Sequence, residues 1–167
     1  LAECEKCAAI EAREAEKDGK LGLAFTLYRQ LSLLSQTDAS CIEAAAAVER
    51  LTQRAEVQLA EAEKAMAQKP YPDVTKLLDQ IATAYAGSVF GEQAQQHRRT
   101  LLNAKADELE ARARTAEKAM NYAKALQLYE LYLTYFPDAD RYQAVKASLE
   151  ALQVLMRRQN GEVGNRE

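Results

Sequence analysis

Apolar positions along this chain recur at the spacing of an α-helix, every three or four residues. Three short stretches carry such stripes, and the stripes superimpose almost position for position. They are Ala24, Leu27, Tyr28, Leu31 and Leu34; Val74, Leu77, Leu78, Ile81 and Tyr85; and Ala125, Leu128, Tyr129, Tyr132 and Tyr135. This spacing puts the apolar side chains on one face of a helix, so each stretch predicts a helix with one buried face.

Two other stripes are considerably longer. They consist of Ile42, Ala45, Val48, Leu51, Ala55, Leu59, Ala62 and Met66, and of Leu102, Ala106, Leu109, Ala113, Ala116 and Met120. A helix of about 30 residues spans about 45 Å, twice the length of the short helices. We therefore expect each long helix to be shared, with one short helix packed on its first half and the next on its second half.

Glycine and proline divide the chain between these stripes. Both residue types are costly inside helices, and here they cluster in the gaps. The predicted helices are 2–18, 20–35, 39–68, 73–86, 89–120, 122–136 and 138–158, which gives an all-α fold of about seven helices. We expect residues 160–167 to form a polar, disordered tail.

The residues expected at helix starts and helix ends recur about every 50 residues. Ala-Glu-Lys triplets at 15–17, 62–64 and 116–118 are expected to mark helix ends. Asp38, Ser88 and Asp138, spaced by 50, are expected to mark helix starts, and Ala44, Ala94 and Ala144 follow at a constant offset. A fixed long period is typical of a helical repeat array. The predicted repeats are 1–37, 38–87 and 88–137, with a capping helix over 138–158, in one domain from 1 to 159.

Charge and hydropathy narrow the classes of partner. The net charge is −3, whereas a nucleic-acid surface needs a strong excess of Lys and Arg, so we expect no nucleic-acid binding. No apolar run approaches the roughly 20 residues of a membrane span. Charge and hydropathy therefore argue against a nucleic-acid surface and against a membrane span.

The segment 113–137 resembles a tetratricopeptide repeat, a motif of about 34 residues in which small residues line the crossing of two antiparallel helices. In this segment the matching positions are Ala113, Tyr122, Ala125, Tyr129 and Pro137. The other two predicted repeats match less completely, at Ala62, Tyr71, Val74 and Leu78 in the middle one and at Ala12, Leu21, Ala24 and Tyr28 in the first. The period is nearer 50, and Ala15, Ala65 and Ala116 replace a large aromatic of the motif. The resemblance implies antiparallel hairpins forming a right-handed solenoid.

The resemblance also implies a surface and a setting. The turns at 85–88 and 136–139 are similar to those of bacterial envelope proteins of this superfamily, such as outer-membrane assembly lipoproteins and cell-division coordinators. In such a solenoid, first-helix residues face a concave, partner-binding side. The matching residues are Lys6, Arg13, Glu16, Glu56, Glu63, Asp107, Arg114 and Glu117, with Tyr122, Tyr132 and Tyr142 as apolar anchors. An ordinary solvated face is the alternative for the charged set.

The sequence contains few residues in a pattern that indicates catalysis. Cys4 and Cys7 form a Cys-x-x-Cys pair, but without the strand and turn that a thioredoxin-like site needs. Incidental thiols, a structural disulfide, and a redox or metal role are the alternatives. A zinc site would need Cys4, Cys7, Cys41 and His97 to converge from three helices. We therefore expect neither enzymatic activity nor a cofactor.

A different class of function is suggested by the last predicted helix. Tyr142, Val145, Leu149, Leu152 and Met156 follow alternating spacings of three and four, as in a coiled-coil seam. If no other helix covers this seam, it would join two copies of the chain. The leading expectation is nevertheless an interaction scaffold that binds a protein or holds neighbouring domains of a larger chain.

Overall fold

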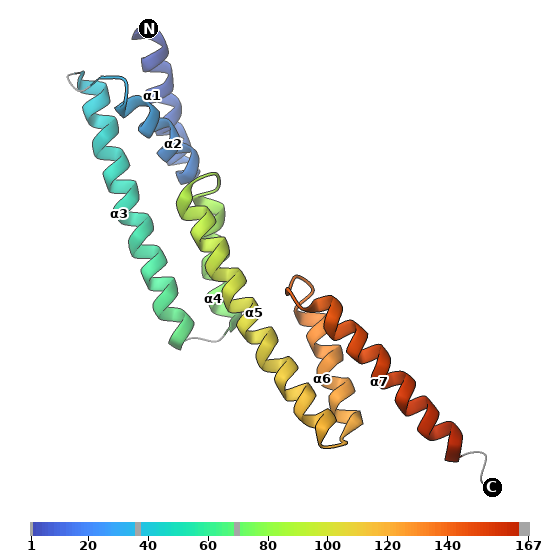
Figure 1. Cartoon of the computed structure of the whole chain (residues 1–167). Coiled ribbons are helices and arrows are strands. Elements are labelled where there is room, and N and C mark those ends of the chain that lie inside the picture. Colours follow the sequence, from blue (N-terminus) through green and yellow to red (C-terminus); the bar gives the residue numbers. More distant parts are fainter. Residues whose placement is uncertain (1, 36–37, 69–70, 164–167) are drawn as a thin grey trace. The chain divides into compact units, whose positions relative to one another are not determined.

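The computed structural model describes residues 2–35, 38–68 and 71–163, and within these ranges it contains seven helices and no strand. The helices are α1 (Ala2–Lys17), α2 (Leu21–Ser32), α3 (Ala39–Gln68), α4 (Tyr71–Ala84), α5 (Val89–Lys118), α6 (Tyr122–Tyr135) and α7 (Tyr142–Val163). The all-α prediction is confirmed (Figure 1). No helix in the described ranges combines the length and apolar character needed to cross a membrane.

Three predicted boundaries need correction. The middle Ala-Glu-Lys triplet lies inside α3, which continues to Gln68, whereas the other two triplets do end α1 and α5. Helix α7 begins at Tyr142, because its first intrahelical bond runs from the Val145 amide to the Arg141 carbonyl. Asp138 therefore does not start the helix, and Ala144 is exposed although Ala44 and Ala94 are buried.

The end of α7 is also later than predicted. The helix continues to Val163, so residues 160–163, which the sequence assigned to a disordered tail, are helical. Residues 164–167 lie outside the described ranges. The chain separates into two units, 1–98 and 99–167, and the boundary falls inside α5.

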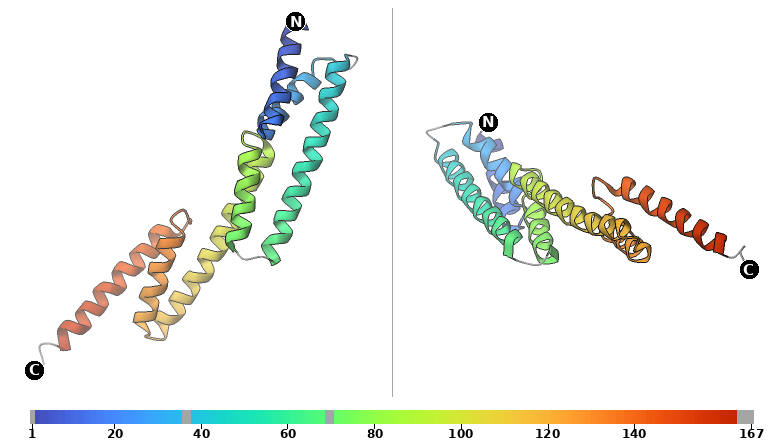
Figure 2. Two further views of the ribbon diagram at one scale, coloured as in Figure 1. Left: turned by 180° about the vertical axis from the view of Figure 1, so that it is seen from behind. Right: turned by 60° about the horizontal axis from the view of Figure 1, so that its bottom comes forward.

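In the first unit, one long helix is shared as expected. Helix α3 packs against both α2 and α4, with α2 beside its first half and α4 beside its second half (Figures 1 and 2). Its buried stripe begins with Cys41, Ala44 and Ala47, whereas Ile42 and Ala45 of the predicted stripe are exposed. From Leu51 to Ala62 the predicted and observed stripes coincide, and at the end of the helix Ala65 is buried whereas the predicted Met66 is half-buried. The wrong start shows that an alanine-rich segment is a poor guide to which face is buried.

A close backbone contact joins α2 to the turn between α4 and α5. A Cβ atom added at Gly22 would lie 2.2 Å from the Ala86 carbonyl oxygen, so only glycine lets the two segments approach this closely. Phe25 and Phe90 pack edge to face beside this contact, with ring centroids 5.3 Å apart. This part of the first unit is held by shape and apolar contact rather than by charge.

In the second unit, α6 packs against α7, and the hydrogen bond from Tyr129 to Glu117 joins α6 to the later part of α5. Tyr129, Tyr132 and Val145 are almost fully buried there. Of the predicted seam on α7, Val145, Leu149 and Leu152 are buried, and α7 packs against α6. Another helix therefore covers the stripe that the sequence offered as a dimer seam.

The hairpins α1–α2 and α5–α6 use the same turn, 101 residues apart. Gly19 and Met120 both have positive φ, +77° and +56°. In each turn the amide after this residue bonds to the carbonyl five residues before it, at 2.8 Å (Lys20 to Ala15) and 2.9 Å (Asn121 to Ala116). A left-handed residue that closes a helix in this way caps its last carbonyls.

Small residues occupy the helix crossings in all three predicted repeats. Ala12, Ala62 and Ala113 are each completely buried, and so are their cross-hairpin counterparts Ala24, Val74 and Ala125, with at most 1% of the side chain exposed. Small side chains allow two helix backbones to approach closely. The positions that the repeat pattern singled out are thus buried in all three hairpins.

Candidate functional site

One hydrogen bond recurs in the first and third hairpins. The Tyr28 hydroxyl donates to Glu16 Oε2 at 3.3 Å, and the Tyr129 hydroxyl donates to Glu117 Oε2 at 2.8 Å. Each pair is separated by 12 residues, and each ties the end of the first helix to the middle of the second. In the middle hairpin the equivalent residues are Met66 and Leu78, both apolar. The polar pair is therefore present or absent as a unit.

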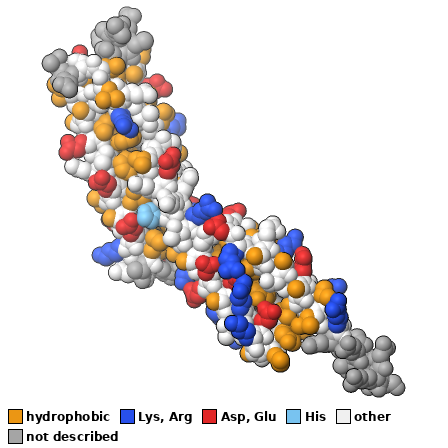
Figure 3. Space-filling model, viewed as in Figure 1, with side chains coloured by type: hydrophobic (Ala, Val, Ile, Leu, Met, Phe, Trp, Pro, Cys, Tyr) orange, Lys and Arg blue, Asp and Glu red, His pale blue; other side chains and the backbone are white. Residues whose placement is uncertain are grey.

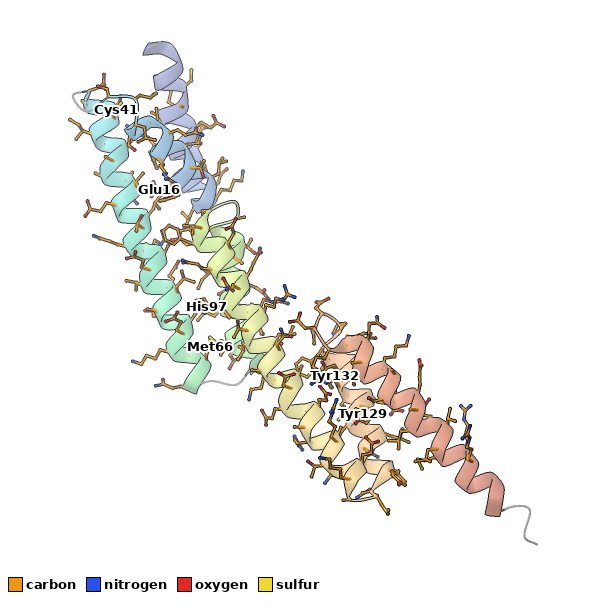
Figure 4. The ribbon with its side chains drawn as sticks, viewed as in Figure 1. Glu16, Cys41, Met66, His97, Tyr129 and Tyr132 are labelled. Atoms are coloured by element: carbon orange, nitrogen blue, oxygen red, sulfur yellow. The ribbon has the colours of Figure 1, made fainter. Side chains whose placement is uncertain are left out.

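Burial and the neighbouring carboxylate both act on the tyrosine. Burial, followed by the hydrogen bond to Glu117, raises the pKa of Tyr129 to about 12, because the phenolate would be poorly solvated and beside a negative charge. Burial and Glu16 raise the pKa of Tyr28 in the same way. Both hydroxyls stay protonated at neutral pH and act as donors. Figure 4 labels Tyr129 and Tyr132 on α6 and Glu16 near the end of α1.

Two of the predicted binding residues on α1 instead hold α1 against α3. Arg13 Nη2 lies 2.9 Å from Glu43 Oε2, and both side chains are largely exposed. Glu16 accepts two hydrogen bonds from the Arg50 guanidinium, one of them 3.0 Å long. Hydrogen bonding to Arg50 lowers the pKa of Glu16, so the carboxylate is charged whenever the pair is formed.

A buried carboxylate occupies the second unit. Glu110 is 3% exposed, and its Oε1 lies 2.7 Å from Arg114 Nη2 and 3.1 Å from Arg141 Nη2. Glu110 thus ties α5 to the residue that precedes α7. Its Oε2 and the nearby Tyr132 hydroxyl have no hydrogen-bond partner among the described residues. Burial, then the negative charge of Glu110, raises the pKa of Tyr132.

Sequence reasoning missed Glu110, although a signal for it was present. Aligned with a 101-residue offset, the counterparts of Glu110 and Tyr132 in the first hairpin are Ala9 and Leu31. In the middle hairpin they are Leu59 and Ile81, both buried. A carboxylate at a position that is otherwise apolar indicates a buried polar contact, and comparing the repeats column by column would have found it.

The remaining predicted residues are spread over both units. Glu63 lies 3.2 Å from His97, so this histidine joins α3 to α5 (Figure 4). Glu56 and Asp107 are exposed and form no ion pair with any described residue. The side chain of Lys6 lies outside the described residues. Tyr132 cannot be an apolar anchor for a partner because it is completely buried.

The cysteines form no bridge in the described part of the molecule. Cys7 is exposed and free, Cys41 is buried and free, and the Cys4 side chain lies outside the described residues. Among the described side chains, no group of three His, Cys, Asp or Glu is placed to hold a metal ion. Cys41 packs at the first turn of α3, whereas His97 pairs with Glu63 (Figure 4).

Each unit carries a groove that is lined by described residues. The first has a volume of about 660 Å³ and lies between the α1–α2 turn and α4, next to Lys20, Thr75 and Asp79. The second has a volume of about 550 Å³ and lies between the later part of α5 and α6. Its floor is apolar and its rim carries Arg112 and Lys124. Neither cation forms an ion pair with a described residue.

Compared with protein-family models, with curated proteins and with solved structures, the chain matches none. Its own contacts are therefore the basis for assigning a role. They show helices joined by hydrogen bonds and ion pairs, with open grooves beside them.

Proposed function

We propose that this chain is a non-catalytic protein-interaction module built of tetratricopeptide-like hairpins in a right-handed solenoid. The observation that carries the proposal is the repeated hairpin. A turn residue with positive φ and a tyrosine–glutamate hydrogen bond occur in the first hairpin and again 101 residues later. Repetition of one supersecondary unit is the principle by which helical arrays build extended binding surfaces. A bacterial envelope protein is the setting that the resemblance favours.

The shifted ionisable groups support a binding role rather than a catalytic one. Hydrogen bonding to Arg50 lowers the pKa of Glu16, whereas burial, followed by the hydrogen bond to Glu117, raises the pKa of Tyr129. Both hydrogen bonds join two helices. Catalytic groups are instead expected to point into a cleft where a substrate can reach them. Here the perturbed side chains hold the hairpins together.

Under this proposal, fewer of the eight predicted charged residues are free to bind a partner. Arg13, Glu16, Arg114 and Glu117 are occupied by contacts within the chain. Glu63 pairs with His97, and the side chain of Lys6 lies outside the described residues. Of the eight predicted charged residues, Glu56 and Asp107 therefore remain with exposed carboxylates for a partner. These two residues occupy the same position in successive repeats, 51 residues apart.

Site-specific photo-crosslinking tests the proposal. A photoreactive residue at position 56 or 107 is expected to give a discrete protein adduct in an extract of the source cells. The matched control is position 146, an exposed lysine on α7 without an ion pair among the described residues. Adducts at 56 and 107 that are absent at 146, and that the unlabelled chain competes away, support the interaction role. A folded protein that gives no adduct at either position contradicts it.

A further inference from the structure

The groove between α5 and α6 has an apolar floor and a basic rim. We call this surface the basic groove and define it by Ala111, Arg112, Thr115, Ala119, Lys124 and Leu128. The only carboxylate among the residues that line it, Glu108, forms an ion pair with Lys105 at 3.0 Å. The charges of Arg112 and Lys124 remain without a partner among the described residues. Figure 3 shows basic side chains in a row along the lower part of α5.

The same surface of the first hairpin has the opposite charge. With the 101-residue offset, Ala111, Arg112, Thr115 and Lys124 correspond to Ile10, Glu11, Glu14 and Leu23. We call this surface, completed by Leu27, the acidic face. Glu11 and Glu14 are exposed and form no ion pair with described residues, and Ile10 and Leu23 are 54% and 43% exposed. Exposed branched side chains beside charges are typical of a contact surface.

The two surfaces complement each other in size as well as charge. The basic groove is lined by Ala111, Thr115 and Ala119, which leave room along α5. The acidic face presents Ile10 at the place equivalent to Ala111 and Leu23 at the place equivalent to Lys124. Large side chains of one surface can fill the space above the small side chains of the other, with Glu11 and Glu14 near Arg112 and Lys124. Complementary potentials of this kind fix partner and register.

We infer that the occupant of the basic groove is a second copy of this chain, docked through its acidic face. This inference rests on the proposed function, because it takes the two hairpins as equivalent units of one array. The contact is heterologous, since two different surfaces meet, so it closes into a ring or extends along an open chain of copies. Because both surfaces are exposed and charged, the contact weakens as salt rises.

Sedimentation velocity of the full chain over a range of protein concentrations tests the inference. The wild type is expected to associate at low salt and to dissociate at least tenfold more readily at 0.5 M salt. The double variant Arg112→Glu/Lys124→Glu and the double variant Glu11→Arg/Glu14→Arg should each be monomeric. The matched control, Lys146→Glu/Arg157→Glu, reverses two exposed basic residues of α7 and should associate like the wild type.

Mixing the two double variants gives the decisive readout. One variant carries two acidic surfaces and the other carries two basic surfaces, so each repels itself but complements the other. An equimolar mixture should therefore regain association, and circular dichroism of each variant verifies that it is folded. A monomeric wild type, association that both variants retain, or a mixture that stays monomeric would each overturn the inference. None of these results affects crosslinking from positions 56 and 107, so the two proposals fail separately.

Discussion

Comparing glycine with alanine at positions 19 and 120 tests whether the two hairpin turns share one backbone conformation. Gly19 and Met120 both have positive φ, which costs a residue with a side chain about 1–2 kcal/mol. Nothing lies within 4 Å of a Cβ built on Gly19, and Met120 is 76% exposed. Packing therefore contributes little at either position, and the backbone dominates.

The magnitude follows from two opposing effects. Alanine restricts the unfolded chain relative to glycine, which contributes about 0.4–1 kcal/mol of stability where the fold tolerates it. At a left-handed position the steric penalty exceeds this gain, so glycine should be more stable than alanine by about 1 kcal/mol at both turns. Gly19→Ala should therefore destabilise the chain, and Met120→Gly should be more stable than Met120→Ala by the same amount.

The assay is urea unfolding followed by circular dichroism. Ala104 is an exposed residue in the interior of α5, where glycine costs about 1 kcal/mol relative to alanine. Ala104→Gly is therefore a control in which alanine, rather than glycine, should be the more stable residue. If the two units unfold in separate steps, Gly19→Ala should move only one of them and Met120→Gly only the other. An alanine at position 120 as stable as glycine would refute the shared turn.

Three more predictions follow from the packing. Between about pH 10 and pH 12 the wild type should lose stability as pH rises, because Tyr129 loses its proton at a lower pH in the unfolded chain than in the folded one. Urea unfolding measured at several pH values should show a smaller loss of stability over this range for Tyr129→Phe. Gly22→Ala should lower the unfolding free energy by about 2 kcal/mol or more, because the added methyl group overlaps the Ala86 carbonyl, and a thermal melt close to that of the wild type would contradict this. The pair Glu110→Leu/Tyr132→Ile gives the third hairpin the apolar pair of the middle one and should be neutral or up to about 4 kcal/mol stabilising in urea, whereas clear destabilisation would show that the buried carboxylate is needed for stability.

Helix content and hairpin crossings are determined by the sequence alone. The alanines at 12, 62 and 113, which the repeat pattern marked as small positions between paired helices, are completely buried. Gly19 closes the first hairpin because it can adopt a left-handed conformation without steric cost. Such local and nearest-neighbour effects leave a periodic trace that can be recognised in one chain.

Other features depend on which segments meet in space. Cys41 and Ala44 are buried while Ile42 is exposed, because α2 contacts that side of α3, and an alanine-rich stretch gives no sign of this choice. Tyr135, which the sequence pattern placed in the apolar stripe, is 67% exposed, whereas the next residue, Phe136, is buried at the position that corresponds to the buried Tyr85. Arg114 can reach Glu110 within α5, but the second ion-pair partner of Glu110, Arg141, is brought beside it only by the tertiary fold. Periodicity specifies which side chains share a face, whereas tertiary contacts alone decide which of those faces are covered and which charges meet.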